Sequence, residues 1–175
     1  GLDAWLSNSG IIIDKNLLLD TQNASFPVPV DRNIGGFVVK ETQLVDYPFF
    51  VDIRESGFNP QVGYTGSLDQ LTLTWASPIS LAKQDGLTML EIAKSSSSSW
   101  VQKDLNIQPD YSRYGEIGFP QNEVLSQELL GVSVTGEFKS YFAGKPPPIY
   151  TPINEGESEA EKTQVGEDFV FNDML

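Results

Sequence analysis

The residue types able to carry chemistry in this chain are limited to carboxylates, lysine, tyrosine and serine. The 175 residues include no histidine and no cysteine, which excludes Ser-His-Asp and Cys-His catalysis and the thiolate sites of zinc and iron–sulfur clusters. The 24 acidic side chains offer too many pairs for any one of them to indicate glycosidase chemistry. We therefore predict a chain that is not an enzyme and that holds no metal and no cofactor.

Two serine patterns resemble catalytic motifs but lack the residues that such motifs need. Ser80-Leu-Ala-Lys83 has the Ser-x-x-Lys spacing that brings a lysine to a serine nucleophile, without the Ser-Asp-Asn and Lys-Thr-Gly segments that accompany it. The run from Ser95 to Ser99 has neither a Gly-x-Ser-x-Gly elbow nor a phosphate-binding Gly-Lys-Ser/Thr loop. We interpret this run as a polar transition from a strand to a loop.

Short polar side chains lie where three expected strands end, over residues 17–20, 71–77 and 92–99. Open α/β sheets bind ligands beyond the carboxyl ends of their strands, where loops converge and backbone groups are free. We therefore place a candidate ligand site there, formed by short polar groups and a tryptophan wall: Asp20, Gln22, Asn23, Ser77 and Ser97, with Trp75 or Trp100. Two alternatives stay open, since these residues could cap strands and satisfy loop amides, or could form the contact surface of a partner protein.

Hydrophobic periodicity predicts one N-terminal helix and a series of short strands. Leu2, Trp5 and Leu6 have helical spacing and precede Gly10, a glycine typical of a helix C-cap. Apolar, β-branched or alternating residues predict strands over residues 11–13, 17–20, 37–39, 49–53, 71–75, 87–93 and 132–138. The strand over 87–93 is expected to be buried. Loops are expected over residues 23–36, 57–66 and 104–120, and two helical turns over residues 123–130.

The chain is strongly acidic, with a net charge of −13 and a pI near 4.2. Such a charge repels phosphate backbones and argues against nucleic-acid partners. The apolar runs are only a few residues long, so we predict no membrane span. We divide the chain into an α/β body over residues 1–144, a flexible Pro-rich and acidic excursion over residues 145–163, and a C-terminal segment over residues 164–175 that returns to the body.

Several short motifs occur in an order that resembles a known family. They are Leu2-Asp-Ala-Trp-Leu with Gly10-Ile, Leu17-Leu-Leu-Asp20-Thr-Gln-Asn23, Leu71-Thr-Leu-Thr-Trp75 and Gly166-Glu-Asp168-Phe169. In this order they are similar to the second half of the GldG-like auxiliary domain of uncharacterised ABC-type transport systems. That family is in turn similar to the gliding-motility auxiliary protein and to a domain of intraflagellar transport proteins.

The resemblance implies both a fold and a function. The fold is α/β, a mixed β-sheet with short flanking helices, as part of a Rossmann-like domain related to glutamine amidotransferases but without their Cys-His pair. The function is that of a non-catalytic, extracytoplasmic ligand- or partner-binding domain in a membrane-anchored ABC transporter auxiliary subunit. The implied partners are the permease and ATPase subunits of the same system, with a small molecule or a sugar as ligand. The implied location is the periplasmic or extracytoplasmic face of the bacterial inner membrane.

Composition alone supports a second hypothesis, from a different class of protein. Carboxylate pairs together with Trp and Tyr side chains would suit a carbohydrate-binding module or a carboxylate-based carbohydrate-active enzyme. Turnover that is lost on single carboxylate substitutions would favour the enzyme, and saturable binding without turnover would favour a module.

Overall fold

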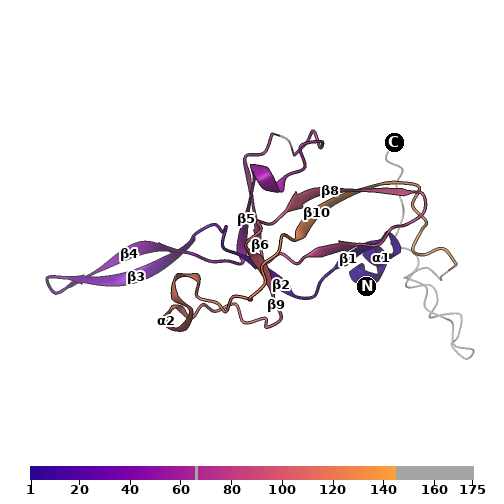
Figure 1. The fold of residues 1–175 in the computed structure, drawn as a ribbon. Helices are drawn as coiled ribbons and strands as arrows, with labels where there is room; N and C mark the ends of the chain where they lie inside the picture. Colours follow the sequence, from indigo (N-terminus) through magenta and orange to yellow (C-terminus); the bar gives the residue numbers. More distant parts are fainter. Residues whose placement is uncertain (66, 145–175) are drawn as a thin grey trace, which may run out of the picture. The chain divides into compact units, whose positions relative to one another are not determined.

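The computed structural model describes residues 1–65 and 67–144, which form short helices and many strands (Figure 1). The helical segments are each a few residues long: α1 Leu2–Asn8, η1 Glu55–Gly57, α2 Tyr111–Tyr114 and η2 Gly115–Ile117. The predicted N-terminal helix is confirmed as α1. It is followed by Gly10, whose φ of 77° lies in the left-handed region that glycine reaches without strain.

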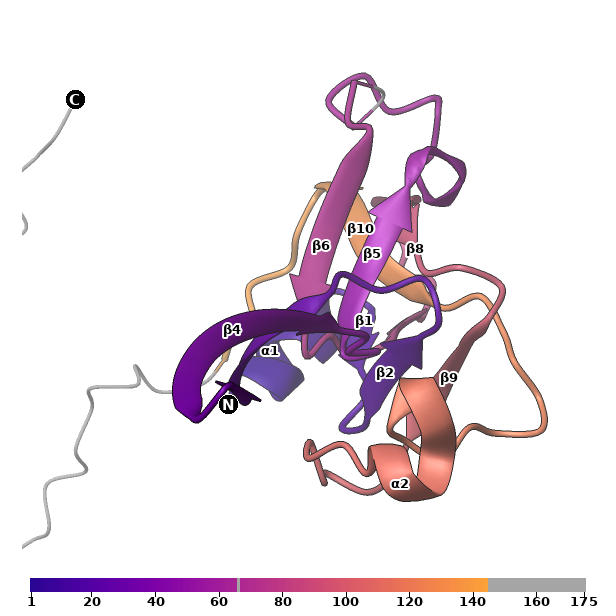
Figure 2. The same cartoon turned by 90° about the vertical axis from the view of Figure 1, so that its left-hand side faces the viewer.

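The strands of the described residues pair two by two, and each pair is antiparallel. The pairs are β1 with β7, β2 with β9, β3 with β4, β5 with β6 and β8 with β10. Figure 2 shows β5 and β6 side by side. The bounds are β1 Ile11–Ile13, β2 Leu17–Asp20, β3 Phe26–Ile34, β4 Phe37–Val45, β5 Phe50–Arg54, β6 Gln70–Thr74, β7 Ile79–Leu81, β8 Leu87–Lys94, β9 Ser99–Gln102 and β10 Leu129–Gly136.

The α/β prediction is confirmed in its coarse form, with more strand than helix. In place of the expected mixed sheet, the described residues form separate two-stranded antiparallel sheets. Parallel strands need a crossover of about a dozen residues or more, usually a helix. The longest described helix, α1, has 7 residues and is too short for that purpose. The Rossmann-like arrangement is therefore not confirmed.

Two clusters of buried apolar side chains form the core, and β2 contributes to both. Successive side chains of a strand point to opposite faces, so Leu18 and Leu19 enter different clusters. Leu18 packs with Val51, Ile53, Phe58, Ala93 and Leu130. Leu19 packs with Tyr47, Phe49, Trp100 and Phe119. The end of β2 is consequently fixed between the two clusters, and the polar residues that follow it start from a rigid position.

Residues 26–45 form a long β-hairpin, which corrects the loop predicted over residues 23–36. β3 and β4 are joined by Gly35 and Gly36, whose φ values of 60° and 89° suit the type I′ turn of a two-residue hairpin loop. The glycine pair is thus the turn itself, and the strand that precedes it is nine residues long.

The prolines of β3 explain why this strand resembled a loop. Proline has no N–H and cannot donate to a sheet. The pairing of Ile34 with Phe37 next to the turn places Pro27 and Pro29 where the backbone nitrogen points away from β4. Proline is tolerated at such outward-facing positions of an edge strand.

Two expectations about the second half of the body also change. The strand predicted over residues 87–93 is confirmed as β8, but only Ala93 in it is buried, since β8 pairs with β10 alone among the described strands. The helical turns expected over residues 123–130 are replaced by an extended segment that leads into β10. Val124 there is 79% exposed, so no apolar helix face finds a partner.

The strand predicted over residues 71–75 is confirmed up to Thr74 as β6. Trp75 leaves the strand with a φ of 50°, so the alternation of side chains ends before it. Residues 1–139 form one compact unit, and a second begins at Ser140. The predicted excursion over residues 145–163 and the segment over residues 164–175 lie outside the described residues. In the described part of the chain, no helix is long and apolar enough to cross a membrane.

Candidate functional site

The Asp20 carboxylate, buried at the end of β2, is the centre of a polar network. Its Oδ1 accepts a hydrogen bond from the Gln22 backbone amide at 2.8 Å and another from the Ser96 hydroxyl. Its Oδ2 accepts from the Ser96 backbone amide at 2.8 Å. A buried carboxylate is tolerated where donors surround it in this way. Asp20 therefore ties the turn after β2 to the turn that precedes β9.

Gln22 and Asn23 use their side chains to hold neighbouring backbone. The side-chain amide of Gln22 donates to the Asp52 carbonyl, and the Asp52 amide donates to the Gln22 carbonyl at 2.9 Å. Asn23 donates through Nδ2 to the Thr21 carbonyl at 3.0 Å and accepts through Oδ1 from the Tyr47 amide at 2.9 Å. These contacts join the turn after β2 to β5.

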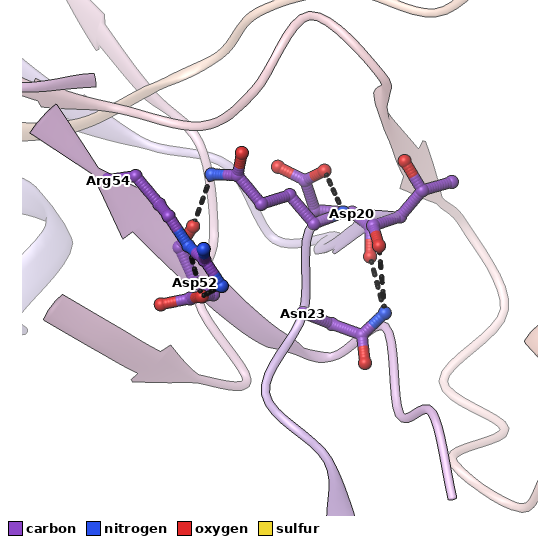
Figure 3. A network of polar contacts seen from close by, with 6 residues as sticks. Asp20, Asn23, Asp52 and Arg54 are labelled. Carbon is purple, nitrogen blue, oxygen red and sulfur yellow. Dashed lines mark hydrogen bonds and ion pairs between the residues drawn. The ribbon is translucent and has the colours of Figure 1, made fainter. Parts of the chain in front are cut away.

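Asp52 is a buried charged residue that was not among the residues predicted from the sequence. Figure 3 shows Asp52 next to Arg54, and it also shows Asn23 next to Asp20. Its Oδ2 accepts from Nε of Arg54 at 2.8 Å and forms an ion pair with Nη2 at 2.7 Å. Its Oδ1 is buried and has no hydrogen-bond partner within the described residues. One feature of the sequence could have identified Asp52. It is an aspartate inside an apolar strand, two positions from Arg54 and therefore on the same face of the strand.

The two predicted tryptophans have different environments. Trp100 is 1% exposed and lies in the core, where its indole N–H donates to the Pro120 carbonyl at 3.0 Å. It therefore does not form an apolar wall at the surface. Trp75 is 46% exposed, and its ring packs edge-on against Phe50 with the ring centres 5.5 Å apart.

Of the predicted site residues, the structure brings Asp20, Gln22 and Asn23 together. Ser77 is half-buried and Ser97 is exposed, and no hydrogen bond within the described residues joins either to Asp20. Apart from the bond between Asp20 and the Ser96 hydroxyl, the hydrogen bonds described for these three side chains go to backbone groups, as the strand-capping alternative describes. Ligand binding at this place stays a prediction.

A small cavity of about 260 Å³ lies between the segment after β5 and the end of β8. Glu91 and Lys94 on its wall form an ion pair at 2.6 Å. The Asn59 side-chain amide, also on the wall, donates to the Glu91 carbonyl at 2.8 Å. On this wall, Glu91 therefore contacts Lys94 through its side chain and Asn59 through its backbone carbonyl.

A larger cavity of about 800 Å³ lies at the base of the β3–β4 hairpin, beside α2. Its apolar wall comes from the hairpin, and its two carboxylates are Asp46 and Glu116, both on exposed residues. The residues that line it are Val28, Val30, Gln43, Leu44, Val45, Asp46, Tyr111, Gly115 and Glu116.

Local hydrogen bonds hold α2 at this cavity. Asp110 precedes the helix and accepts from the Ser112 hydroxyl at 2.6 Å and from the Arg113 amide at 3.1 Å. These two bonds, the Ser112 bond first, hold the pKa of Asp110 below its ordinary value. Tyr111 donates to the Asp46 carbonyl at 3.1 Å. Burial, followed by the charge of Asp46, raises the pKa of Tyr111 above its ordinary value.

One face of the hairpin carries two groups of apolar side chains. Alternate residues of paired strands share a face, and the apolar members of this face, which we call the apolar face, are Phe26, Val28, Val30, Ile34, Phe37, Val39 and Val45. Arg32, Glu41 and Gln43 lie on the same face among them. The outer members are exposed, Ile34 by 55%, Phe37 by 77% and Val39 by 46%. Contiguous exposed apolar side chains of this kind mark interaction surfaces. Their common face was missed because residues 23–36, which include Ile34, were predicted to be a loop, although residues 37–39 were predicted to be a strand.

Together, these features define a strand-rich α/β domain of paired antiparallel strands, with a buried polar network and an exposed apolar hairpin. The chain belongs to the family of auxiliary components of the ABC-type uncharacterized transport system, whose family model matches residues 1–174. The resemblance seen in the sequence motifs is thereby confirmed. Comparisons with curated proteins and with solved structures found no match.

Proposed function

We propose that this chain is a non-catalytic, extracytoplasmic binding domain of a membrane-anchored auxiliary subunit in an ABC transport system. Its partners are the permease and ATPase subunits of the same system. Membership of the family supports its place in transport. The lack of histidine and cysteine in the sequence supports a role without catalysis. So does the engagement of the buried Asp20 and Asp52 carboxylates with neighbouring groups of the fold.

The observation that carries the binding role is the exposed apolar face of the hairpin. Phe37 and Ile34 lie next to the turn and are more than half exposed. Keeping such side chains in water is unfavourable, and a partner that covers them gains the corresponding hydrophobic free energy. The hairpin therefore suits a surface that a partner occupies.

Co-purification tests this role directly. The full-length protein, expressed with the permease and ATPase of its own system and purified through a tag in detergent, should retain both subunits. Phe37→Ser should reduce the amount retained, because it removes the most exposed aromatic ring of the apolar face. Val124→Ser is the matched control, since Val124 is 79% exposed and lies outside the hairpin. Retention of neither subunit, or an equal loss in the control, would contradict the proposal.

The extracytoplasmic location has a separate test, because a chain without cysteine accepts a single reporter thiol. Ser97 is exposed, so Ser97→Cys should react with a membrane-impermeant maleimide in intact cells. Ser99 is fully buried, and Ser99→Cys should react only after denaturation. Labelling of Ser97→Cys only after cell lysis would place the domain in the cytoplasm.

The exposed ring of Trp75 favours the carbohydrate alternative as a second candidate, because sugars stack on exposed aromatic faces. A glycan array with the full-length protein distinguishes the two. Saturable binding that Trp75→Ala abolishes would support a carbohydrate-binding module. Hydrolysis that a single carboxylate substitution abolishes would support the enzyme.

A further inference from the structure

The two edges of the β3–β4 hairpin differ in what they offer to another strand. Because Ile34 pairs with Phe37 across a two-residue loop, the backbone groups of alternate residues point outward from the hairpin. On β3, two of these outward positions are Pro27 and Pro29, which have no N–H to donate. The β3 edge is therefore blocked over its first half.

The outward positions of β4 keep both a donor and an acceptor. They are Val38, Lys40, Thr42 and Leu44, and all four are exposed. Within the described residues, the sheet that contains β4 has β3 as its one other strand. With respect to the described part of the chain, β4 therefore presents an unpaired edge along nine residues. An open edge of this kind is what strand addition requires.

The same edge leads to the larger cavity. Residues 43–46, at the end of β4, line it together with Val28 and Val30 of the apolar face. A strand that pairs with β4 therefore brings one end to the cavity. On the way, alternate side chains of that strand meet Phe37 and Val39 and remove them from water.

The charges along this surface select the chemistry of the added strand. The hairpin carries two acidic and two basic side chains and is neutral, whereas the chain has a net charge of −13. Arg32 and Glu41 pair with each other at 3.3 Å. The carboxylates at the cavity are Asp46 and Glu116, which a basic side chain complements. A second copy of the chain would bring another large negative charge and is disfavoured.

We propose that the β4 edge binds an extended segment of a partner protein as a third strand, with apolar side chains against the apolar face and a Lys or Arg at the cavity beside Asp46 and Glu116. This inference rests on the proposed binding function and names its surface and the chemistry of its partner. Backbone pairing supplies affinity, and the alternating side chains with the basic residue supply specificity.

The probe for this proposal is a labelled synthetic peptide of about ten residues, close to the length of β4, in which Val and Thr alternate between one Lys at each end, so that a Lys reaches the cavity in either strand direction. Its control has Glu in place of both Lys. The full-length protein should bind the lysine peptide at least about tenfold more tightly than the glutamate peptide, as fluorescence anisotropy at physiological salt reports. Equal binding of the two peptides, or no binding of either, would overturn the proposal.

Two matched proline substitutions test which edge is used. Thr42→Pro removes an outward N–H of β4 directly opposite Pro29, and Asp31→Pro removes an outward N–H of β3. Thr42→Pro should weaken binding of the lysine peptide by about tenfold or more, whereas Asp31→Pro should change it by less than about twofold. An equal loss in both variants would show that pairing with β4 is wrong.

A measurement on the unchanged protein covers the case in which Thr42→Pro loses its fold. In an extended peptide, the N–H groups of alternate residues point to the same edge. N-methylation of every second residue of the lysine peptide therefore blocks one edge and leaves the other free, and there are two such peptides. One of the two alternately methylated peptides should bind like the parent, and a fully methylated peptide should not bind. Binding of the fully methylated peptide would overturn strand addition. A dimer of the protein that Thr42→Pro abolishes would also overturn the proposal, because the occupant would then be a second copy.

The two proposals fail separately. If the peptide assays fail while the permease and ATPase still co-purify, strand addition at β4 is wrong and the transport role stands. If the peptide binds as expected while neither subunit co-purifies, the transport role is wrong and the β4 edge serves another partner.

Discussion

A single buried carboxylate connects two turns that are 76 residues apart in the sequence, since Asp20 accepts from both the amide and the hydroxyl of Ser96. Asp20→Asn places a side-chain NH2 group at the position of Oδ2. That buried donor then faces the Ser96 backbone amide, which is also a donor. We expect a loss of about 2 kcal/mol in the free energy of unfolding, measured by urea denaturation. Asp31→Asn, at an exposed position of β3, should change it by less than about 0.5 kcal/mol. Equal effects in the two variants would contradict the role of Asp20.

The pKa of Asp110 determines how α2 responds to acid. Hydrogen bonds from Ser112 and Arg113 lower this pKa in the folded state, so the folded state binds fewer protons than the unfolded state. The contribution of Asp110 is therefore present above its unfolded pKa and is lost as the pH falls through its folded pKa. We expect the Arg113 amide to exchange its hydrogen faster, relative to the intrinsic rate, on acidification. Asp110→Asn still caps the helix without titrating and should not show this change.

The candidate site could be predicted from the sequence only where its contacts are local. Asp20, Gln22 and Asn23 lie in one turn, and their proximity followed from the end of a predicted strand. Asp52 joins them from β5, and Trp100 is drawn into the core by the pairing of Leu19 with Trp100 across β2 and β9. Such pairings depend on contacts between segments far apart in the sequence, which local periodicity does not encode.

At the scale of elements, the strands with strong apolar periodicity were predicted and the hairpin was not. β1, β2, β5 and β6 follow short apolar or alternating runs, which indicate strands without any knowledge of their partners. In β3, Pro27 and Pro29 interrupt an alternation of Phe26, Val28 and Val30. Only the register with β4, set by the glycine turn, shows that both prolines face outward.

The glycine turn gives a prediction for the hairpin as an element. Gly36 has a φ of 89°, a value that a β-branched residue rarely adopts. Gly36→Val should cost the hairpin about 1–2 kcal/mol through backbone strain. An added Cβ meets nothing within 4 Å there, so steric contact plays no part. Amide exchange of Arg32 should accelerate by a factor of about 5–30.

Gly35→Asn is the control for the turn. Asn followed by Gly is the preferred pair of a type I′ loop, so Gly35→Asn should leave the exchange of Arg32 unchanged. If Gly36→Val exchanges as slowly as the unsubstituted chain, the turn is not the type that its φ values indicate.

For the whole molecule, the composition gives the net charge and shows that the chain has no histidine and no cysteine. It does not indicate how the strands pair. β1 with β7 and β2 with β9 join residues that lie between 66 and 85 positions apart in the sequence. The strand predicted over residues 132–138 is confirmed as β10, yet its pairing with β8 was not predicted. Several antiparallel pairings satisfy the same apolar pattern.

We expect the outer part of the hairpin to be separable from the core within the unit formed by residues 1–139. Residues 31–40 are all exposed and contribute to neither core cluster. Val30 pairs with Glu41, and this pair is a hydrogen-bonded pair of the ladder like Ile34 with Phe37. Asn-Gly in place of residues 31–40 therefore rebuilds a two-residue turn in the same register. We expect this replacement to change the free energy of unfolding by less than about 0.5 kcal/mol, followed through the near-UV signal of the buried Trp100.

The comparison variant for this replacement is Ile53→Ala, which truncates a fully buried side chain of the core. It should cost about 2–5 kcal/mol. The shortened hairpin should also lose the binding of the lysine peptide, because Val38, Lys40 and the exposed members of the apolar face (Ile34, Phe37 and Val39) are removed while the core stays folded. A loss of stability comparable to that of Ile53→Ala would show that the hairpin supports the core and is more than a binding surface.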